Sequence, residues 1–235
     1  MLNESDWAAG RAPRHIAIEG PIGVGKTTLT RAIATLLDAR MVIEVPSENP
    51  FLERFYSDAR AWALPTQLTF LLQRARQARE LIQPELFART VVSDFIVEKD
   101  RIFAELTLAA DELELYLQVY SEIMGGIPVP DLVIYLHAPI EILQARILAR
   151  AIDYEQTISA EYLAELGRAY GQFFSQYHSA PLLIVDTTAL NFAEDDTALH
   201  KLLSAAMQVD SGRSFLSAQE FKFGDAFAHQ PLGWC

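Results

Sequence analysis

Residues 20–27 constrain what this chain can fold into more than any other segment. They read Gly-Pro-Ile-Gly-Val-Gly-Lys-Thr and match the pattern G-x-x-x-x-G-K-[ST] at every position. The run 15–19 before them predicts a short strand, and residues 25–38 predict a helix. In this strand–loop–helix context, backbone N–H groups cradle phosphate oxygens and the helix N-terminus favours an anion. The segment therefore predicts a phosphate-binding loop.

The loop motif also assigns roles to individual side chains. Lys26 is expected to reach the β- and γ-phosphates of ATP, and the Thr27 hydroxyl is expected to bind Mg²⁺. ATP and Mg²⁺ are thus the expected cofactors. Contacts with the ATP phosphates are expected from the whole loop, which comprises Gly20, Gly23, Val24, Gly25, Lys26, Thr27 and Thr28.

Strand-like and helix-like segments alternate along the chain. This order predicts an α/β fold of the P-loop NTPase type, with a five-stranded parallel sheet, helices on both faces and a short lid. The expected strands are 15–19, 41–45, 90–94, 131–138 and 182–187. The expected helices are about 25–38, 65–83, 99–122, 139–150, 159–178 and 194–207, with Pro65 in a first turn.

Three regions are expected along the chain. Residues 1–14 predict a flexible arm, and residues 15–208 predict one domain whose lid covers about 146–157. Residues 209–235 predict an aromatic-rich tail without helical or strand period, whose aromatic side chains dock on the body or on a partner subunit. With 235 residues, 51% of them hydrophobic, one large domain is favoured over two small ones.

Charge and cysteine content narrow the class of partner. The net charge of −12 disfavours nucleic acid and anionic membranes, so a phosphate site is expected as a local positive island. The only cysteine is Cys235, which excludes an intrachain disulfide and suits a reducing cytoplasm. No apolar run reaches membrane-spanning length, and residues 1–14 lack the apolar core of a signal peptide.

Acidic residues at strand ends are the first candidates for chemistry, because ligands bind beyond the carboxyl ends of parallel strands. Glu44 ends the second expected strand and is either a general base for an attacking hydroxyl or an ordinary surface acid. Asp94 ends the third and is expected to hold Mg²⁺ directly or through water.

Helical spacing supplies the second group of candidates. Gln67 and Arg74 are two turns apart on one helix face, where they either read a base edge or form an exposed polar face. Arg146 and Arg150 are four residues apart at a helix end. They form either a clamp on a transferring phosphoryl group or a pair of surface arginines.

Together these motifs resemble the deoxynucleoside kinase family, especially its bacterial deoxyadenosine/deoxyguanosine kinase-like branch. The resemblance runs from about residue 15 to residue 192. The motifs that carry it are 20–28, Glu44 with 48–52, Phe55 with Tyr56, Gln67 with Arg74, Ser93 with Asp94, 100–104, Arg146, Arg150, Glu155 with Gln156, and 161–163.

The resemblance implies an activity and a role for each matching residue. The activity is ATP-dependent 5′-phosphorylation of a deoxynucleoside, preferably a purine one, for nucleotide salvage by a cytoplasmic homodimer. The implied catalytic residues are Glu44 as the base, Lys26, and the lid residues Arg146 and Arg150. Tyr56 and Glu155 would hold the sugar 3′-hydroxyl, and Thr27 and Asp94 the metal. The remaining substrate-binding residues would be Gln67, Arg74, Asp100 and Phe103.

Two positions depart from the family pattern. Many members carry an arginine after the third-strand acid and another in the lid, where this chain has Phe95 and Ile152. Lys99 and Arg101 are the candidate substitutes. Without a substitute the chain would be a catalytically impaired nucleotide-binding or assembly subunit. A kinase for nucleoside monophosphates is a weaker alternative, because that acceptor needs an additional cationic pocket.

Overall fold

The described part of the chain in this computed structural model (residues 13–82, 90–192, 195–217 and 219) is built around one parallel sheet. Within these residues the sheet has six strands in the order β2-β3-β1-β4-β5-β6, and every neighbouring pair is parallel. The strands are β1 (His15–Glu19), β2 (Arg40–Val42), β3 (Val91–Ser93), β4 (Leu132–His137), β5 (Leu182–Asp186) and β6 (Arg213–Leu216).

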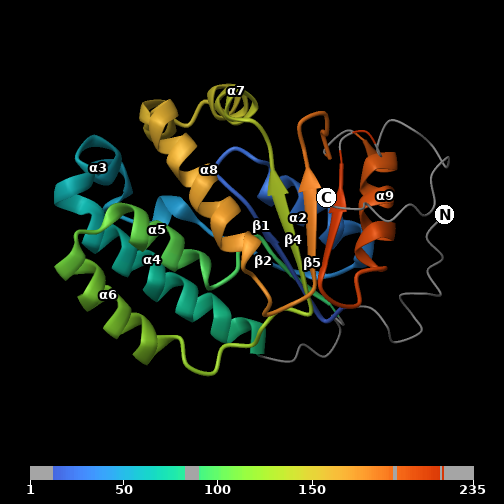
Figure 1. Cartoon of the computed structure of the whole chain (residues 1–235), viewed down its shortest axis with the longest axis horizontal. Helices are drawn as coiled ribbons and strands as arrows, with labels where there is room; N and C mark the ends of the chain where they lie inside the picture. The colour runs from blue at the N-terminus through green and yellow to red at the C-terminus, as the bar shows by residue number, and fades with distance from the viewer. Residues whose placement is uncertain (1–12, 83–89, 193–194, 218, 220–235) are drawn as a thin grey trace, which may run out of the picture.

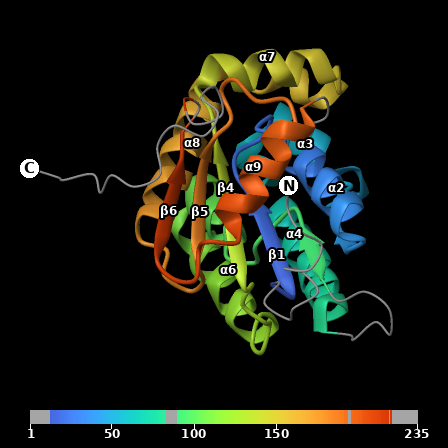
Figure 2. The ribbon, with the colours of Figure 1, turned by 90° about the vertical axis from the view of Figure 1, so that its right-hand side faces the viewer.

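Helices cover both faces of the sheet (Figure 1). They are α2 (Lys26–Leu37), α3 (Leu52–Ser57), α4 (Ala59–Ile82), α5 (Lys99–Thr107), α6 (Ala110–Ile123), α7 (Ile140–Arg150), α8 (Ala160–Ser175) and α9 (Asp196–Ala206). Two short 3₁₀ helices, η2 (Pro46–Glu48) and η3 (Asp153–Thr157), lie in connections. Helices α2 and α9 lie on the same side of the sheet (Figure 2). Over the residues described, no helix is both long and apolar enough to cross a bilayer.

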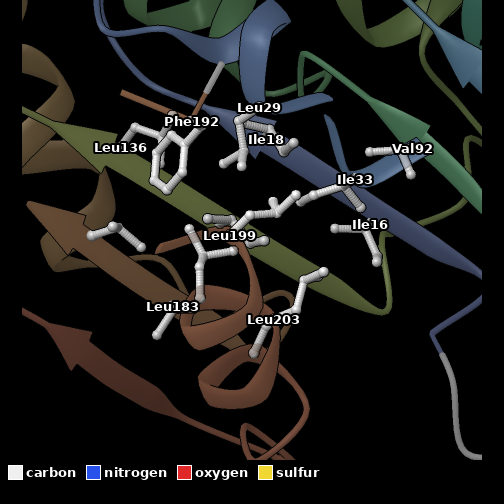
Figure 3. Close-up of a cluster of buried hydrophobic side chains, with 14 of the residues drawn as sticks. Ile16, Ile18, Leu29, Ile33, Val92, Leu136, Leu183, Phe192, Leu199 and Leu203 are labelled. Carbon is white, nitrogen blue, oxygen red and sulfur yellow. The ribbon is translucent and has the colours of Figure 1, made fainter. Parts of the chain in front are cut away.

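The core has two layers because successive strand residues point to opposite faces. On one face, Ile16 and Ile18 of β1 pack with Leu29 of α2 and Leu203 of α9 (Figure 3). On the other face, Ala17 packs with side chains of α5 and α8. Burial on both faces explains why β4 reads as a continuous apolar run.

The expected parallel α/β fold is confirmed, with one strand more than expected. The additional strand β6 lies in the segment that the sequence predicts as a tail without strand period, so that expectation was wrong for residues 213–216. Pairing with the edge of β5 creates this strand, whose Phe215 is 66% exposed. The predicted arm up to residue 12 and the aromatic residues Phe221, Phe223, Phe227 and Trp234 lie outside the described residues.

Three helix predictions need correction. The segment 99–122 forms two helices, because Leu108 and Ala109 are extended and the Glu112 carboxylate accepts a bond from the Ala109 N–H at 3.1 Å, which starts α6. Pro65 lies inside α4 and not in its first turn, since Asp58 accepts a bond from Ala61 N–H and begins the helix earlier. Helix α3 was not expected at all.

Candidate active site

The phosphate-loop segment connects β1 to α2 and turns sharply on its glycines. Gly23 has φ +82°, and a Cβ there would lie 2.8 Å from the backbone oxygen of Leu143 in α7. Gly25 has φ +103° at the residue that caps α2. A side chain at Gly23 would meet both a backbone clash and an unfavourable conformation, so the loop can approach α7 only without one.

Lys26 lies inside this loop. Its ammonium donates to the backbone oxygens of Gly20 at 2.7 Å and Pro21 at 3.2 Å. Burial, and after it the positive charge of Lys99, lower the pKa of Lys26 to about 8. A second cation therefore lies close enough to the phosphate loop to act on its lysine.

Three polar residues join the phosphate loop to the ends of β2 and β3. The Thr27 hydroxyl donates to Asp94 Oδ2 at 2.7 Å, and the Glu44 backbone N–H donates to Asp94 Oδ1 at 2.8 Å. Asp94 is 2% exposed. Asp94 is 67 residues from Thr27 and 50 residues from Glu44 along the chain. The two bonds bring these residues together at the carboxyl ends of the parallel strands, where ligands are expected to bind.

The oxygen set of Thr27 and Asp94 suits Mg²⁺. This ion is commonly held by one or two carboxylates, with waters and substrate phosphates completing its octahedron. Across the described ranges, no group of three or more His, Cys, Asp or Glu side chains could hold a metal by itself. Thr27 and Asp94 would therefore hold a magnesium ion shared with a triphosphate, where it would neutralise phosphate charge.

A cavity of about 430 Å³ opens beside Glu44, and we refer to it as the acceptor cavity. Its volume is within the size range of small-molecule sites. Of the residues that the sequence predicts for substrate binding, those that line it are Glu44, Tyr56, Gln67, Arg74, Phe103 and Glu155. They come from α3, α4, α5, η3 and the segment after β2. The structure thus brings the predicted acceptor site together, except for Asp100.

Asp100 lies behind Arg74 instead of lining the cavity. It is 1% exposed, and its Oδ1 lies 2.5 Å from Arg74 Nη2. Burial raises the pKa of Asp100, although the Arg74 charge opposes that shift. In this geometry Asp100 positions Arg74, and a direct contact between Asp100 and a base remains a prediction.

Glu44 lies between two buried cations. Its Oε1 contacts Arg74, and its Oε2 accepts a hydrogen bond from the Lys99 ammonium. The Glu44 side chain is 15% exposed, against 4% for Arg74 and 5% for Lys99. Glu44 therefore keeps a solvent-accessible edge toward the cavity while both cations are shielded.

Helices α3 and η3 form another part of the cavity wall. The Tyr56 ring stacks on Tyr154 with centroids 6.0 Å apart, and burial raises the pKa of Tyr56. The Glu155 carboxylate, 8% exposed, accepts a bond from the guanidinium of Arg150. The negative charge of Glu155 also raises the pKa of Tyr56. The two predicted sugar-binding residues therefore lie near each other.

Gln67 and Phe103 complete the walls of this cavity. The Gln67 amide donates to Thr107 Oγ1 at 3.3 Å, and the side chain is 3% exposed. The Phe103 ring packs edge-on against Tyr170 with centroids 6.2 Å apart. A fixed carboxamide beside aromatic faces is a suitable environment for a planar base.

A second cavity of about 450 Å³ lies on the other side of the phosphate loop. Gly23, Lys26, Thr27 and Arg150 line both cavities. The second cavity is further lined by Val24, Gly25, Thr28, Arg146, Leu190, Asn191 and Phe192. The phosphate loop and Arg150 are therefore the common wall between an acceptor space and a space for the rest of a nucleotide.

The two predicted lid arginines have different surroundings. Arg146 donates to Val24 O at 3.2 Å, to Thr187 Oγ1 and O at 3.1 and 2.7 Å, and to Leu190 O at 3.1 Å. It thus ties the phosphate loop to the segment after β5. Arg150 alone of the two reaches the acceptor cavity, so the convergence of both on one phosphoryl group remains a prediction.

Glu19 was not expected as a site residue. It is fully buried at the end of β1 and accepts bonds from Gly20 N–H at 2.8 Å, Tyr170 O–H at 3.0 Å and Ile96 N–H at 3.0 Å. Its negative charge raises the pKa values of both Lys26 and Lys99 against the effect of burial. The available signal in the sequence was a lone acid that ends an apolar strand directly before the glycine loop.

A parallel sheet and a glycine-lysine phosphate loop that lines two cavities, one of them with a carboxylate in its wall, define a P-loop phosphotransferase. The deoxynucleoside kinase family model matches residues 16–209. The chain therefore belongs to the deoxynucleoside kinase family and is a phosphotransferase that uses a nucleoside triphosphate. The family expected from the sequence motifs is thereby confirmed.

Several characterised proteins are similar to this chain over most of its length. A deoxyguanosine kinase of Bacillus subtilis is 33% identical over 75% of this chain and 88% of its own length. A deoxyadenosine/deoxycytidine kinase of the same organism is 26% identical, over 83% and 92%. The structure of deoxyadenosine kinase from M. mycoides with bound dCTP has the same fold, with a TM-score of 0.68 and 24% identity over 81% of this chain and 97% of that one.

Proposed function

We propose that this chain transfers the γ-phosphoryl group of ATP, bound with Mg²⁺, to the 5′-hydroxyl of a purine deoxynucleoside. The observation that carries the proposal is the position of Glu44. Its carboxylate lines the acceptor cavity, and its N–H is bonded to the same Asp94 that accepts from Thr27 of the phosphate loop. A hydroxyl bound in that cavity would therefore meet a base where the triphosphate ends.

Catalysis in such a site is mainly positioning and charge stabilisation. Glu44 would accept the hydroxyl proton as the nucleoside oxygen attacks phosphorus. Tyr56 and Glu155 would hold the sugar at its 3′-hydroxyl, which fixes the distance of the 5′-oxygen from the phosphate loop. Lys26 would exchange its bonds to loop carbonyls for bonds to phosphate oxygens, since both are acceptors within its reach.

The names of similar proteins support a purine acceptor. The Gln67 carboxamide offers donors and an acceptor beside aromatic side chains, which suits a planar base of either kind. Two of the similar proteins bear the names deoxyguanosine kinase and deoxyadenosine/deoxycytidine kinase. Because the second name includes a pyrimidine, the preference must be tested directly.

The test is an ADP-release assay with deoxyadenosine, deoxyguanosine, deoxycytidine and thymidine as acceptors. We expect the highest kcat/KM with a purine deoxynucleoside. A pyrimidine preference would refute the base assignment, and no turnover with any acceptor would refute the proposed function. Gln67→Leu should raise KM for the preferred nucleoside roughly 10- to 100-fold, the range for leaving a buried partner unpaired. Gln172→Leu, an exposed position on α8, is the matched control.

The alternative of an impaired subunit rests on Phe95 and Ile152 in place of arginines. Lys99 places a cation beside Glu44, and this position favours an active enzyme over the alternative. Binding of ATP and nucleosides in calorimetry without ADP production would instead support the impaired subunit.

Self-association, salvage and a cytoplasmic location belong to the same proposal. Leu72 on α4 and Leu115 on α6 are each 48% exposed, and these helices pack together. A homodimer could bury them, whereas Phe174 of α8 is buried against the sheet. Sedimentation of the full chain would distinguish a dimer from a monomer.

A further inference from the structure

This chain lacks two arginines that many members of the family carry. The positive charge that would stabilise a transferring phosphoryl group must therefore come from other residues. Phe95 is 1% exposed and lines a small apolar cavity away from the acceptor space, with the Arg74 guanidinium 5.8 Å from its ring centroid. Ile152 lines the acceptor cavity but carries no charge. Neither residue can stabilise a transferring phosphoryl group, so any replacement must come from elsewhere.

Lys99 is the cation that the fold brings to this place. It begins α5, is 4% exposed and lines the acceptor cavity together with Lys26 and Glu44. Its ammonium donates to Glu44 Oε2, and its charge lowers the pKa of Lys26. Lys99 is thus bonded to the expected base and lines the same cavity as the lysine of the phosphate loop.

Burying the charge of Lys99 costs free energy, and this cost indicates that the residue has a functional role. The pKa of Lys99 is lowered to about 8, because burial and the Arg74 charge outweigh the opposing charges of Glu19, Asp94 and Asp100. Buried ion pairs of this kind are often no more stabilising than apolar side chains of similar volume. Stability alone therefore gives little reason for a lysine at this position.

Arg101, the other candidate substitute, points elsewhere. Its guanidinium lies 3.1 Å from Glu105, one turn along α5, and both side chains are 52% exposed. It lines a different surface hollow and not the acceptor cavity. The neighbouring cation therefore provides a control with the same charge, on the same helix, outside the site.

We propose that Lys99 is a catalytic residue whose ammonium replaces the missing arginine at the transferring phosphoryl group. This inference rests on the proposed kinase function. The nucleoside 5′-oxygen forms the new O–P bond, its proton passes to Glu44, and the bond from the γ-phosphorus to the bridging oxygen breaks with its electron pair leaving on ADP. Protonation of Glu44 weakens its hold on Lys99, so the ammonium becomes available to the phosphoryl oxygens as their charge develops.

The experiment compares Lys99→Met, Lys99→Gln, Lys99→Arg and Arg101→Met with the wild-type chain. Steady-state kinetics give kcat, and calorimetry gives the Kd for the preferred nucleoside. We expect Lys99→Met and Lys99→Gln to lower kcat about 10³-fold, the lower end for a cation on a transferring phosphoryl group, with Kd changed less than about threefold. Lys99→Arg should recover at least tenfold of that loss because it restores the charge, and Arg101→Met should match the wild type.

Several outcomes would overturn the inference. A kcat for Lys99→Met or Lys99→Gln within about fivefold of the wild type would exclude a catalytic role. Parallel losses of kcat, nucleoside affinity and melting temperature in the neutral variants would assign Lys99 a structural role. Should neither neutral variant fold, an inactive but folded Lys99→Arg that still binds nucleoside would overturn it, and an active one would support it. A wild-type chain without turnover would refute the proposed function and this inference together.

Discussion

Replacement of Glu44 by glutamine tests the central carboxylate without changing its size. In the wild-type chain Glu44 Oε1 contacts Arg74 and Oε2 accepts from Lys99. Glutamine keeps one acceptor oxygen but cannot take a proton at neutral pH. The substitution therefore removes the proposed base while preserving the shape of the acceptor cavity, and nucleoside affinity should change less than about threefold.

The magnitude follows from what could replace the missing base. General base catalysis contributes about 10²- to 10⁴-fold, or roughly 3–5 kcal/mol of activation free energy. Asp94 also lines this cavity, but its oxygens accept bonds from Thr27 and the Glu44 N–H, and it is the proposed Mg²⁺ ligand. Because Mg²⁺ would make this carboxylate a poor base, we expect kcat to fall by about 10³- to 10⁴-fold, the upper half of the range.

The assay is ADP release at saturating ATP and nucleoside, with the nucleoside Kd measured separately by calorimetry. Glu48→Gln is the matched control, because Glu48 is an exposed acid four residues along the same segment. A Glu44→Gln chain with kcat within about fivefold of the wild type would show that another group takes the proton. A large loss of nucleoside affinity would show instead that Glu44 mainly positions the substrate.

Three further predictions concern the phosphate loop and the two buried lysines. Gly23→Ala should raise KM for ATP at least tenfold, since a Cβ would lie 2.8 Å from Leu143 O at φ +82°; Gly125→Ala, which has open space, should not. Because Lys26 and Lys99 both have pKa values lowered to about 8, kcat/KM for ATP should fall as pH rises through about 8. Between about pH 8 and 10.5 the unfolded chain binds more protons at these lysines than the native one, so chemical denaturation should show their contribution to stability increasing with pH. A kcat/KM that is flat to pH 9 would contradict the need for charged lysines.

Local sequence patterns predicted the sheet and the phosphate loop because both depend on local chemistry. The apolar run of β4 is buried on both faces, and the loop motif has backbone requirements that few other sequences meet. β6 escaped prediction because its four residues have no alternation, and it exists only through pairing with β5. Glu19 escaped because its partner Tyr170 is 151 residues away.

The choice between Lys99 and Arg101 could not be made from the sequence for a geometric reason. Residues two apart on a helix point about 200° apart, so only one of these two cations can face a given site. Which one does so depends on the rotation of α5, and this is fixed by contacts of Ile102 and Ala104 with two different core clusters. Helical spacing could therefore supply both candidates and exclude neither.

The charges of the site lead to a last prediction, about Mg²⁺. A local positive island was expected on this acidic chain, yet every cation at the junction has carboxylate neighbours. The charges of Glu19 and Asp94 act on Lys26, and Glu44 contacts both Lys99 and Arg74. Asp100 also contacts Arg74, and Glu155 contacts Arg150. Side chains in such balance cannot by themselves neutralise a triphosphate.

A divalent cation held by Thr27, Asp94 and the phosphates would supply the missing charge. Chelation of Mg²⁺ with EDTA should therefore reduce turnover at least 10³-fold and weaken ATP binding, while nucleoside binding in calorimetry stays within about twofold. Asp94→Asn should raise the Mg²⁺ concentration needed for half-maximal rate, whereas Glu48→Gln should not. Turnover that survives chelation would mean that these balanced side chains neutralise the triphosphate alone, against the electrostatic argument.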